Sequence, residues 1–229
     1  MRKLLLVAAI ALVCSSMALA TNTDELALVS TGATTIVVLD TSVGGNSITY
    51  SDADFNGWDI EFTAGVSTSP NTEIPALDLT SLTATCGGLD VKTCAANPLE
   101  IWYSDTGFTT AVNGLTTFYS ATVEGGGSTS QIAYGDPTDT IFGTTVTIGT
   151  VGPLASPGGS GTATLTGSYG PSPYSLSLEQ VFTDTGKGAV TFSVDGSLSD
   201  VPEPTSIVLF GTILSLGGFA FRRKLKKNS

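Results

Sequence analysis

The stretch Trp58-Asp59-Ile60-Glu61-Phe62 alternates apolar and acidic side chains over five successive residues. Successive side chains of a β-strand point to opposite faces of its sheet, so this alternation is typical of a strand with one buried and one solvated face. A helix does not have this period, because side chains two residues apart point to nearly opposite sides of it. The stretch therefore predicts a sheet that covers a core on one side.

The same pattern recurs to both sides of this stretch. The chain between its two ends is rich in Thr, Ser, Gly and Val and poor in Lys, Glu and Leu, which favours strands and turns. No sustained helical periodicity precedes Thr205. Further strands are expected at Thr34 to Leu39, Leu99 to Tyr103 and Leu115 to Val123, around Tyr174, Leu176 and Leu178, and around Phe192, Val194 and Leu198, with Pro153 to Gly161 as a mobile loop. These features predict a mainly β ectodomain over residues 21–200, an antiparallel β-sandwich or jelly roll of on the order of ten strands.

The N-terminus has the three parts of a cleavable signal peptide. Arg2 and Lys3 precede an apolar run from Leu4 to Val13, and the pattern closes with Ala18 and Ala20. The apolar run is far shorter than the roughly 20 residues that a spanning helix needs. Residues 1–20 are therefore predicted to direct the chain through the secretory translocase, with signal peptidase cutting after Ala20.

The C-terminus has an apolar segment between a proline-containing motif and a basic tail. The uncharged stretch from Thr205 to Phe221 is close to the shortest length that spans a membrane. A basic cluster directly after it favours the cytoplasmic side, so the ectodomain is expected outside the inner membrane, held by a single transmembrane helix at about 205–221. The residues of this basic tail are Arg222, Arg223, Lys224, Lys226 and Lys227.

From Val201 to Lys227 the chain resembles the PEP-CTERM sorting signal, a pattern also labelled as the C-terminal domain of ice-binding proteins. The motif is Pro202-Glu203-Pro204, followed by the apolar helix and the basic tail. The resemblance implies processing by an exosortase, release to the cell surface or extracellular matrix of a Gram-negative-type bacterium, and an association with exopolysaccharide and biofilm. The two prolines predict an extended strip that a peptidase can read at the membrane surface.

The body also resembles the ectodomain of uncharacterised PEP-CTERM proteins. The resemblance rests on Ala76 to Ser81, Tyr103 to Phe108 and Ser172 to Leu176. It implies one continuous β-domain at 21–200, with 201–229 as the sorting signal.

The composition of the exported body excludes several function classes. Nineteen of the twenty acidic residues lie between Asp24 and Asp200, where only Lys92 and Lys187 are basic. Such a surface repels nucleic acid and anionic headgroups, so neither is expected as a partner. The chain has no histidine, which removes the commonest general base and the commonest zinc ligand. No catalytic residues are predicted.

Two cysteines lie in the body, Cys86 and Cys94, on either side of a glycine-containing loop. In an exported protein such a pair predicts a structural disulfide, since a metal site needs further soft ligands and a catalytic thiol needs a base. The only cofactor hypothesis is calcium. Asp52, Asp54 and Asn56 match the first half of a calcium loop, but the closing glutamate is absent, and a turn rich in Asp and Asn is the alternative interpretation.

Other residues suggest ligands without fixing them. Four glutamates are available to a hydrolase, but nothing in the sequence pairs them, and these are Glu61, Glu100, Glu124 and Glu179. Trp102, if exposed, would stack on sugar rings. Threonine runs at Thr145 to Thr147 and Thr162 to Thr166 suggest an ice-binding face, or simply the solvated side of strands.

The sequence thus predicts an exported, membrane-anchored and then exosortase-processed surface or matrix protein without enzymatic activity, in contact with exopolysaccharide. The alternative is a carbohydrate-binding β-sandwich module. An ice-binding or adhesion protein and a secreted hydrolase are further alternatives.

Overall fold

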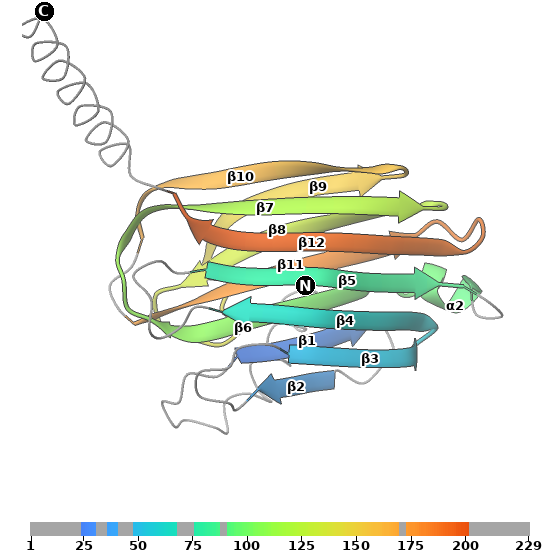
Figure 1. Cartoon of the computed structure of the whole chain (residues 1–229), viewed down its shortest axis with the longest axis horizontal. Coiled ribbons are helices and arrows are strands. Elements are labelled where there is room, and N and C mark those ends of the chain that lie inside the picture. Colours follow the sequence, from blue (N-terminus) through green and yellow to red (C-terminus); the bar gives the residue numbers. More distant parts are fainter. Residues whose placement is uncertain are drawn as a thin grey trace, which may run out of the picture.

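The structure, a computed structural model, describes residues 24–30, 36–40, 48–67, 76–87, 91–169 and 173–201. Two six-stranded antiparallel sheets pack face to face in it, as Figure 1 shows, which confirms the mainly β sandwich. The predicted signal peptide with Ala18 and Ala20, the Pro202–Pro204 motif, the span at 205–221 and the basic tail lie outside the described residues. No helix within the described ranges is long and apolar enough to cross a membrane.

Each sheet is built from strands that are distant in sequence. Sheet A contains, from edge to edge, β2 (Ile36–Asp40), β1 (Asp24–Ser30), β6 (Leu99–Phe108), β11 (Tyr174–Asp184), β8 (Gly127–Asp136) and β9 (Val146–Ala155). Sheet B contains β10 (Gly158–Tyr169), β7 (Val112–Glu124), β12 (Val190–Asp200), β5 (Ala76–Cys86), β4 (Trp58–Ser67) and β3 (Ile48–Phe55). The edge strands β9 and β10 are consecutive, so the turn between them joins the two sheets along one side of the sandwich (Figure 1).

The core forms where the alternating apolar side chains of the two sheets meet. Trp58, Ile60 and Phe62 are at most 2% exposed, while Asp59 and Glu61 between them are exposed. The alternation in this stretch therefore predicts the faces of β4 correctly. Burying each of these large side chains contributes roughly 2–3 kcal/mol to folding.

Aromatic contacts join the two sheets across this core. The ring of Phe192 on sheet B lies 5.4 Å from the ring of Phe182 on sheet A, and 6.1 Å from that of Trp58. The indole Nε1 of Trp58 donates to the carbonyl oxygen of Asn97 at 2.9 Å, so this buried donor is satisfied.

The expectation of a mobile loop at Pro153 to Gly161 is wrong, because the segment forms the end of β9, a tight turn and the start of β10. Proline is tolerated on an edge strand, and Pro153 lies at an irregularity in the pairing of β9 with β8. Gly158 has a φ of +111°, and a Cβ there would lie 2.0 Å from the carbonyl oxygen of Ala121. Glycine here permits close strand pairing rather than mobility.

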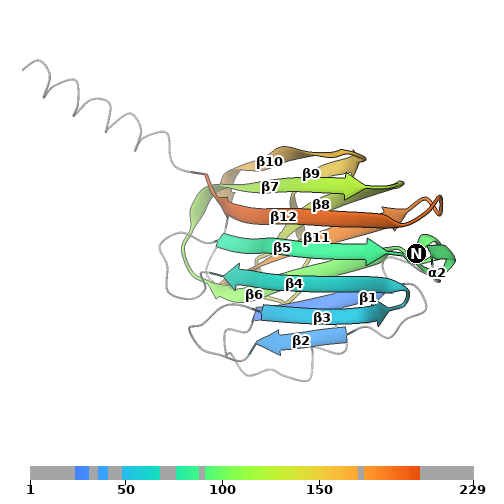
Figure 2. The same ribbon diagram turned by 45° about the vertical axis from the view of Figure 1, so that its right-hand side comes forward.

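A short helix, α2 (Val91–Ala96), interrupts the strands where none was expected. Six residues make fewer than two helical turns, which is too short for an apolar periodicity to appear in the sequence. Figure 2 shows α2 at the end of the sandwich where β5 ends.

Candidate functional site

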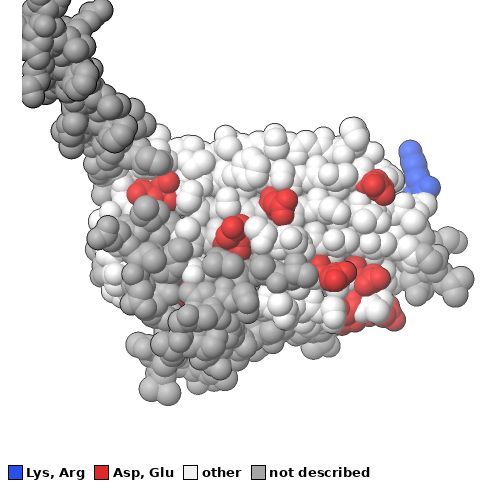
Figure 3. Space-filling view, in the orientation of Figure 1, with Lys and Arg blue, Asp and Glu red and all other residues white. Residues whose placement is uncertain are grey.

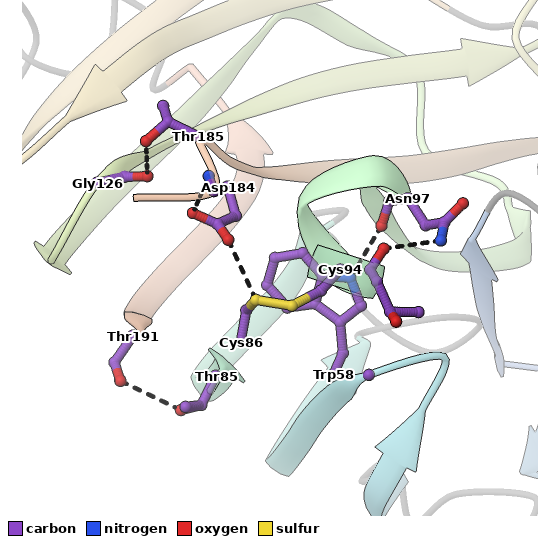
Figure 4. The surroundings of a disulfide bond; sticks show 12 residues. Trp58, Thr85, Cys86, Cys94, Asn97, Gly126, Asp184, Thr185 and Thr191 are labelled. Atoms are coloured by element: carbon purple, nitrogen blue, oxygen red, sulfur yellow. Dashed lines mark hydrogen bonds between the residues drawn. A yellow bond between two sulfur atoms is a disulfide. The ribbon is translucent and has the colours of Figure 1, made fainter. Parts of the chain in front are cut away.

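The predicted disulfide is present between Cys86, the last residue of β5, and Cys94 in α2, with the two Cα atoms 6.0 Å apart. Figure 4 shows the carboxylate of Asp184 beside it, with Oδ2 at 3.2 Å from Sγ of Cys86. The other carboxylate oxygen of Asp184 accepts the backbone N–H of Gly186 at 3.0 Å. Cys86, Cys94 and Asp184 lie close enough together to be metal ligands, but the two sulfurs are bonded to each other. The disulfide therefore serves as a structural link between α2 and β5.

The predicted calcium ligands lie in the hairpin that joins β3 to β4. The two-residue loop Asn56-Gly57 has φ values of 55° and 87°, the left-handed conformation that such hairpins require. Asp52 Oδ1 accepts the N–H of Asp54 at 3.0 Å, and Asp54 Oδ1 accepts the N–H of Gly57 at 3.2 Å. These contacts are those of a turn, and calcium binding stays a prediction that a calcium-dependent rise in melting temperature would support.

The structure places the four glutamates as two on each outer face. Glu61 and Glu124 point outward from sheet B, and Glu100 and Glu179 from sheet A. Glu179 is buried and accepts a hydrogen bond from the hydroxyl of Tyr134 at 2.7 Å. Burial and the charges of Glu179 and Glu100 raise the pKa of the Tyr134 phenol, so the hydroxyl of Tyr134 stays protonated.

A carboxyl group is buried between the sheets near their ends. Asp105 is fully buried, and it accepts hydrogen bonds from the hydroxyl of Ser67 and from the N–H of Thr106. Burial, together with the neighbouring charge of Asp24, raises the pKa of Asp105 to about 8. The raised pKa favours the neutral, protonated form of this carboxyl group, as burial between the sheets requires.

Of the two alternatives for Trp102, an exposed platform or a packed residue, the structure shows the packed one, because the side chain is only 3% exposed. Its ring stacks on Tyr134 with centroids 5.8 Å apart, and it meets Phe142 edge-on at 6.4 Å. Trp102 belongs to a second, small apolar cluster on the outer face of sheet A. It is therefore not a platform for sugar.

The outer face of sheet B carries a hollow of about 540 Å³. Strands β5, β7, β10 and β12 contribute mostly small hydroxyl side chains to it, with a single carboxylate among the residues that line it. The lining residues are Ser81, Leu82, Thr83, Ser120, Ala121, Thr122, Gly159, Ser160, Ser193, Val194 and Asp195. Side chains of this size leave the middle of the sheet lower than its surroundings.

A β-bulge positions the carboxylate of this hollow. Leu82 pairs with Val194 and Leu79 pairs with Gly196, so two residues of β5 lie opposite Asp195 alone. One of the two, Ser81, has a φ of 56°, and its N–H donates to Asp195 Oδ1 at 3.0 Å. The bulge thus holds the exposed side chain of Asp195 at the rim of the hollow.

An exposed aromatic ring lies next to the hollow. Phe118 is 40% exposed and is the one large apolar side chain exposed among the described residues. It lies on β7 two residues from Ser120, so both side chains project from the same face. Gln131 of sheet A reaches across the core and donates to the carbonyl oxygen of Phe118 at 2.9 Å and to the hydroxyl of Thr117 at 2.7 Å. The backbone under the ring is therefore held in place.

The charge around the hollow is negative. Figure 3 shows acidic side chains over this face, and among the described residues it shows Lys or Arg at one end of this view. Burial and the nearby charge of Asp195 raise the pKa of Asp78, which points outward from β5. The two carboxylates therefore repel each other across the β5–β12 pair.

Sequence reasoning missed both Phe118 and Asp195. A signal for Phe118 existed, because Leu115, Tyr119 and Val123 fix the inward phase of β7 and the phenylalanine is out of phase with them. Nothing comparable marks Asp195, since its position depends on a bulge in a strand far away in sequence.

The sequence matches no family model and no curated protein. Among solved structures it is similar to the enzymatically active domain of tailspike protein 4 of bacteriophage CBA120, at 9% identity over 66% of this chain and 21% of that one, with a TM-score of 0.31. This chain thus spans about a fifth of that structure.

Two further similar structures are carbohydrate-binding modules. TmCBM61 in complex with β-1,4-galactotriose is 9% identical over 69% of this chain and all of that one, with a TM-score of 0.32. A module of the β-sandwich superfamily is 15% identical over 75% and 72% of the two chains, with a TM-score of 0.31. Such low scores establish no shared function, so the ligand has to be argued from the site itself.

Proposed function

We propose that this chain is an exported β-sandwich protein that binds polysaccharide on the outer face of sheet B. The observation that carries the proposal is the exposed ring of Phe118 beside a hollow lined by hydroxyl groups and the carboxylate of Asp195. An aromatic face covers the apolar C–H side of a sugar ring, while hydroxyl and carboxylate groups form hydrogen bonds with the hydroxyls of the sugar. The volume of the hollow suits a ligand of a few sugar units.

The strands under the hollow supply the rigidity that such a site needs. Phe118 and most of the hollow lie on β5, β7 and β12, each of which is paired on both sides, and the edge strand β10 contributes only Gly159 and Ser160. A binding site on strands is held more firmly than one on loops, so less entropy is lost when a ligand binds.

Binding without hydrolysis is the better proposal for this hollow. Glycosidases use two carboxyl groups roughly 5–10 Å apart across the scissile bond. Asp195 is the single carboxylate among the residues that line the hollow, and Asp78 lies outside that lining. We therefore assign this site no catalytic role.

The route to the cell exterior remains a proposal that rests on the two ends of the chain. The N-terminal signal and the Pro202-Glu203-Pro204 tail support export followed by exosortase processing to the surface or matrix. Sequencing the mature termini of the protein from cells with and without the exosortase tests this route. An unprocessed tail in both kinds of cell would contradict it.

Titration of the exported protein with neutral oligosaccharides and amino-sugar oligosaccharides, followed by calorimetry, tests the binding proposal. Phe118→Ala should weaken binding about tenfold, because truncating a central aromatic contact typically costs 1 kcal/mol or more. The matched control is Ile132→Ala, which removes apolar atoms from the outer face of sheet A. Equal losses in the two variants, or no binding by the unmodified protein, would contradict the proposal.

A further inference from the structure

We infer that the hollow on sheet B selects polysaccharides whose sugar units carry a protonated amine. This inference rests on the proposed function and names the ligand class of the same site. It follows from where the aromatic ring, the carboxylates and the positive charges lie.

Phe118 and the carboxylates of Asp78 and Asp195 lie close together on the outer face of sheet B. Phe118 on β7 pairs with Ser197 on β12, and Ser197 pairs with Asp78 on β5. The ring and Asp78 thus lie in one row across three strands, roughly 10 Å apart at the backbone. Asp195 lies on β12 two residues from Ser197, diagonal to the ring and within reach of a side chain or sugar substituent.

Within the described part of the chain, these carboxylates have no positive partner close by. Lys92 in α2 and Lys187 in the β11–β12 turn are the only basic residues within the described ranges. The turn that contains Lys187 packs against α2, because a Cβ on the adjacent Gly186 would lie 3.3 Å from the Cβ of Ala95 in that helix. Both lysines therefore belong to the same end of the sandwich, away from the hollow. The pKa of Asp78 is raised, because burial and the negative charge of Asp195 both disfavour the ionised form of Asp78.

An ammonium group at the rim of the hollow, between Asp195 and the neighbouring Asp78 outside the lining, relieves the repulsion between the two carboxylates. The negative face of the Phe118 ring attracts the same charge. A neutral sugar makes the hydroxyl contacts but leaves the repulsion in place. A uronic acid polymer adds negative charge to a negative face and is repelled.

The test compares glucosamine oligomers with the same oligomers fully N-acetylated, using the exported protein at pH 6 and low salt. The free-amine oligomer should bind about tenfold more tightly, and the advantage should shrink as salt screens the charges. Asp195→Asn should remove most of this advantage, because it lowers affinity for the free-amine oligomer much more than affinity for the acetylated oligomer. Glu124→Gln, a carboxylate on the same face at the end of β7, is the matched control and should change neither affinity.

The outcomes separate the two proposals. Equal binding of both oligomers, weakened by Phe118→Ala, would overturn the amine preference and leave the polysaccharide site standing. An amine preference that survives in the Asp78→Asn, Asp195→Asn double variant would come from the overall negative charge and would also overturn the inference. Failure of both oligomers to bind would overturn it together with the proposed function. Melting curves of each variant show whether it is folded.

Discussion

The two outer faces of the sandwich carry the same ingredients and arrange them in opposite ways. Each face has an aromatic residue among polar ones, Phe118 on sheet B and Trp102 on sheet A, and each has outward carboxylates. Phe118 is 40% exposed and Trp102 is 3% exposed. An aromatic side chain on the polar side of a strand therefore becomes a candidate site only where nothing packs over it.

The loop between β8 and β9 makes this difference. It folds back over sheet A, where Phe142 packs on Trp102 and donates its N–H to the hydroxyl of Ser104 at 2.9 Å. The hydroxyl of Ser175 donates to the carbonyl oxygen of Thr140 in the same loop at 2.6 Å. Over the hollow of sheet B, the described residues include no comparable covering segment.

The largest expected effect is on stability, through the aromatic residue of the covered face. Trp102→Ala should lower the free energy of unfolding by about 3 kcal/mol, because it leaves a cavity in a packed cluster. Phe118→Ala is the counterpart on the open face and should cost about 0.5 kcal/mol or less, because much of that ring is already solvated. Urea denaturation of both variants measures the contrast. Similar costs would mean that the two faces are packed alike, and the comparison would fail.

The next effect comes from the residue that ties down both ends of the loop. Asp136 Oδ1 accepts the N–H of Thr138 and Asp136 Oδ2 accepts the hydroxyl of Thr145, both at 2.7 Å. Asp136→Ala should cost about 1 kcal/mol, because the partly exposed donors of Thr138 and Thr145 lose a charged acceptor. It should also shift tryptophan fluorescence to the red as water reaches Trp102. The control is Asp59→Ala on the exposed side of β4, which should change neither quantity.

The pH dependence of this anchor has a definite sign. Burial raises the pKa of Asp136, but the hydrogen bonds from Thr138 and Thr145 outweigh it, so the pKa lies below its ordinary value. The stabilisation is therefore present above about pH 4, the ordinary pKa of Asp, and is lost as the pH falls through the lowered value. The fluorescence shift should appear in the unmodified protein below that pH, and its absence would mean that other contacts hold the loop.

The smallest effect concerns the open face. Asp78→Asn should raise stability at pH 7 by a few tenths of a kcal/mol, since it removes the repulsion between Asp78 and Asp195. The effect is small because solvent screens this repulsion at the surface. The raised pKa of Asp78 means that this repulsion grows as the pH rises through it, so the gain should vanish near pH 4. Denaturation at the two pH values measures it, with Glu124→Gln as the control. A loss of stability in Asp78→Asn would show that the carboxylate is held by favourable contacts.

The sequence predicted part of this fold well and part of it wrongly, for identifiable reasons. Alternation identified β4 and β12, because one face of each is buried and period-two patterning records burial directly. It also identified β11, although the serines that alternate with its apolar residues are buried on the other face of sheet A. It failed at Pro153 to Gly161, where glycine and proline serve close pairing and an edge position rather than a loop. It also failed at α2, because a helix of this length is too short to show an apolar period. The Cys86–Cys94 disulfide holds this helix in place.

The sequence by itself determined the β class, the disulfide partners and the negative charge of the body, since each of these depends on residue types and local spacing. Only the tertiary structure decided which aromatic side chain meets solvent. That outcome depends on a loop folding over one sheet, and the position of Asp195 depends in the same way on a bulge in the other, both of which join residues far apart in the chain. Side-chain exposure is set by what packs on top, and local patterning carries no record of a neighbour that arrives from elsewhere in the chain.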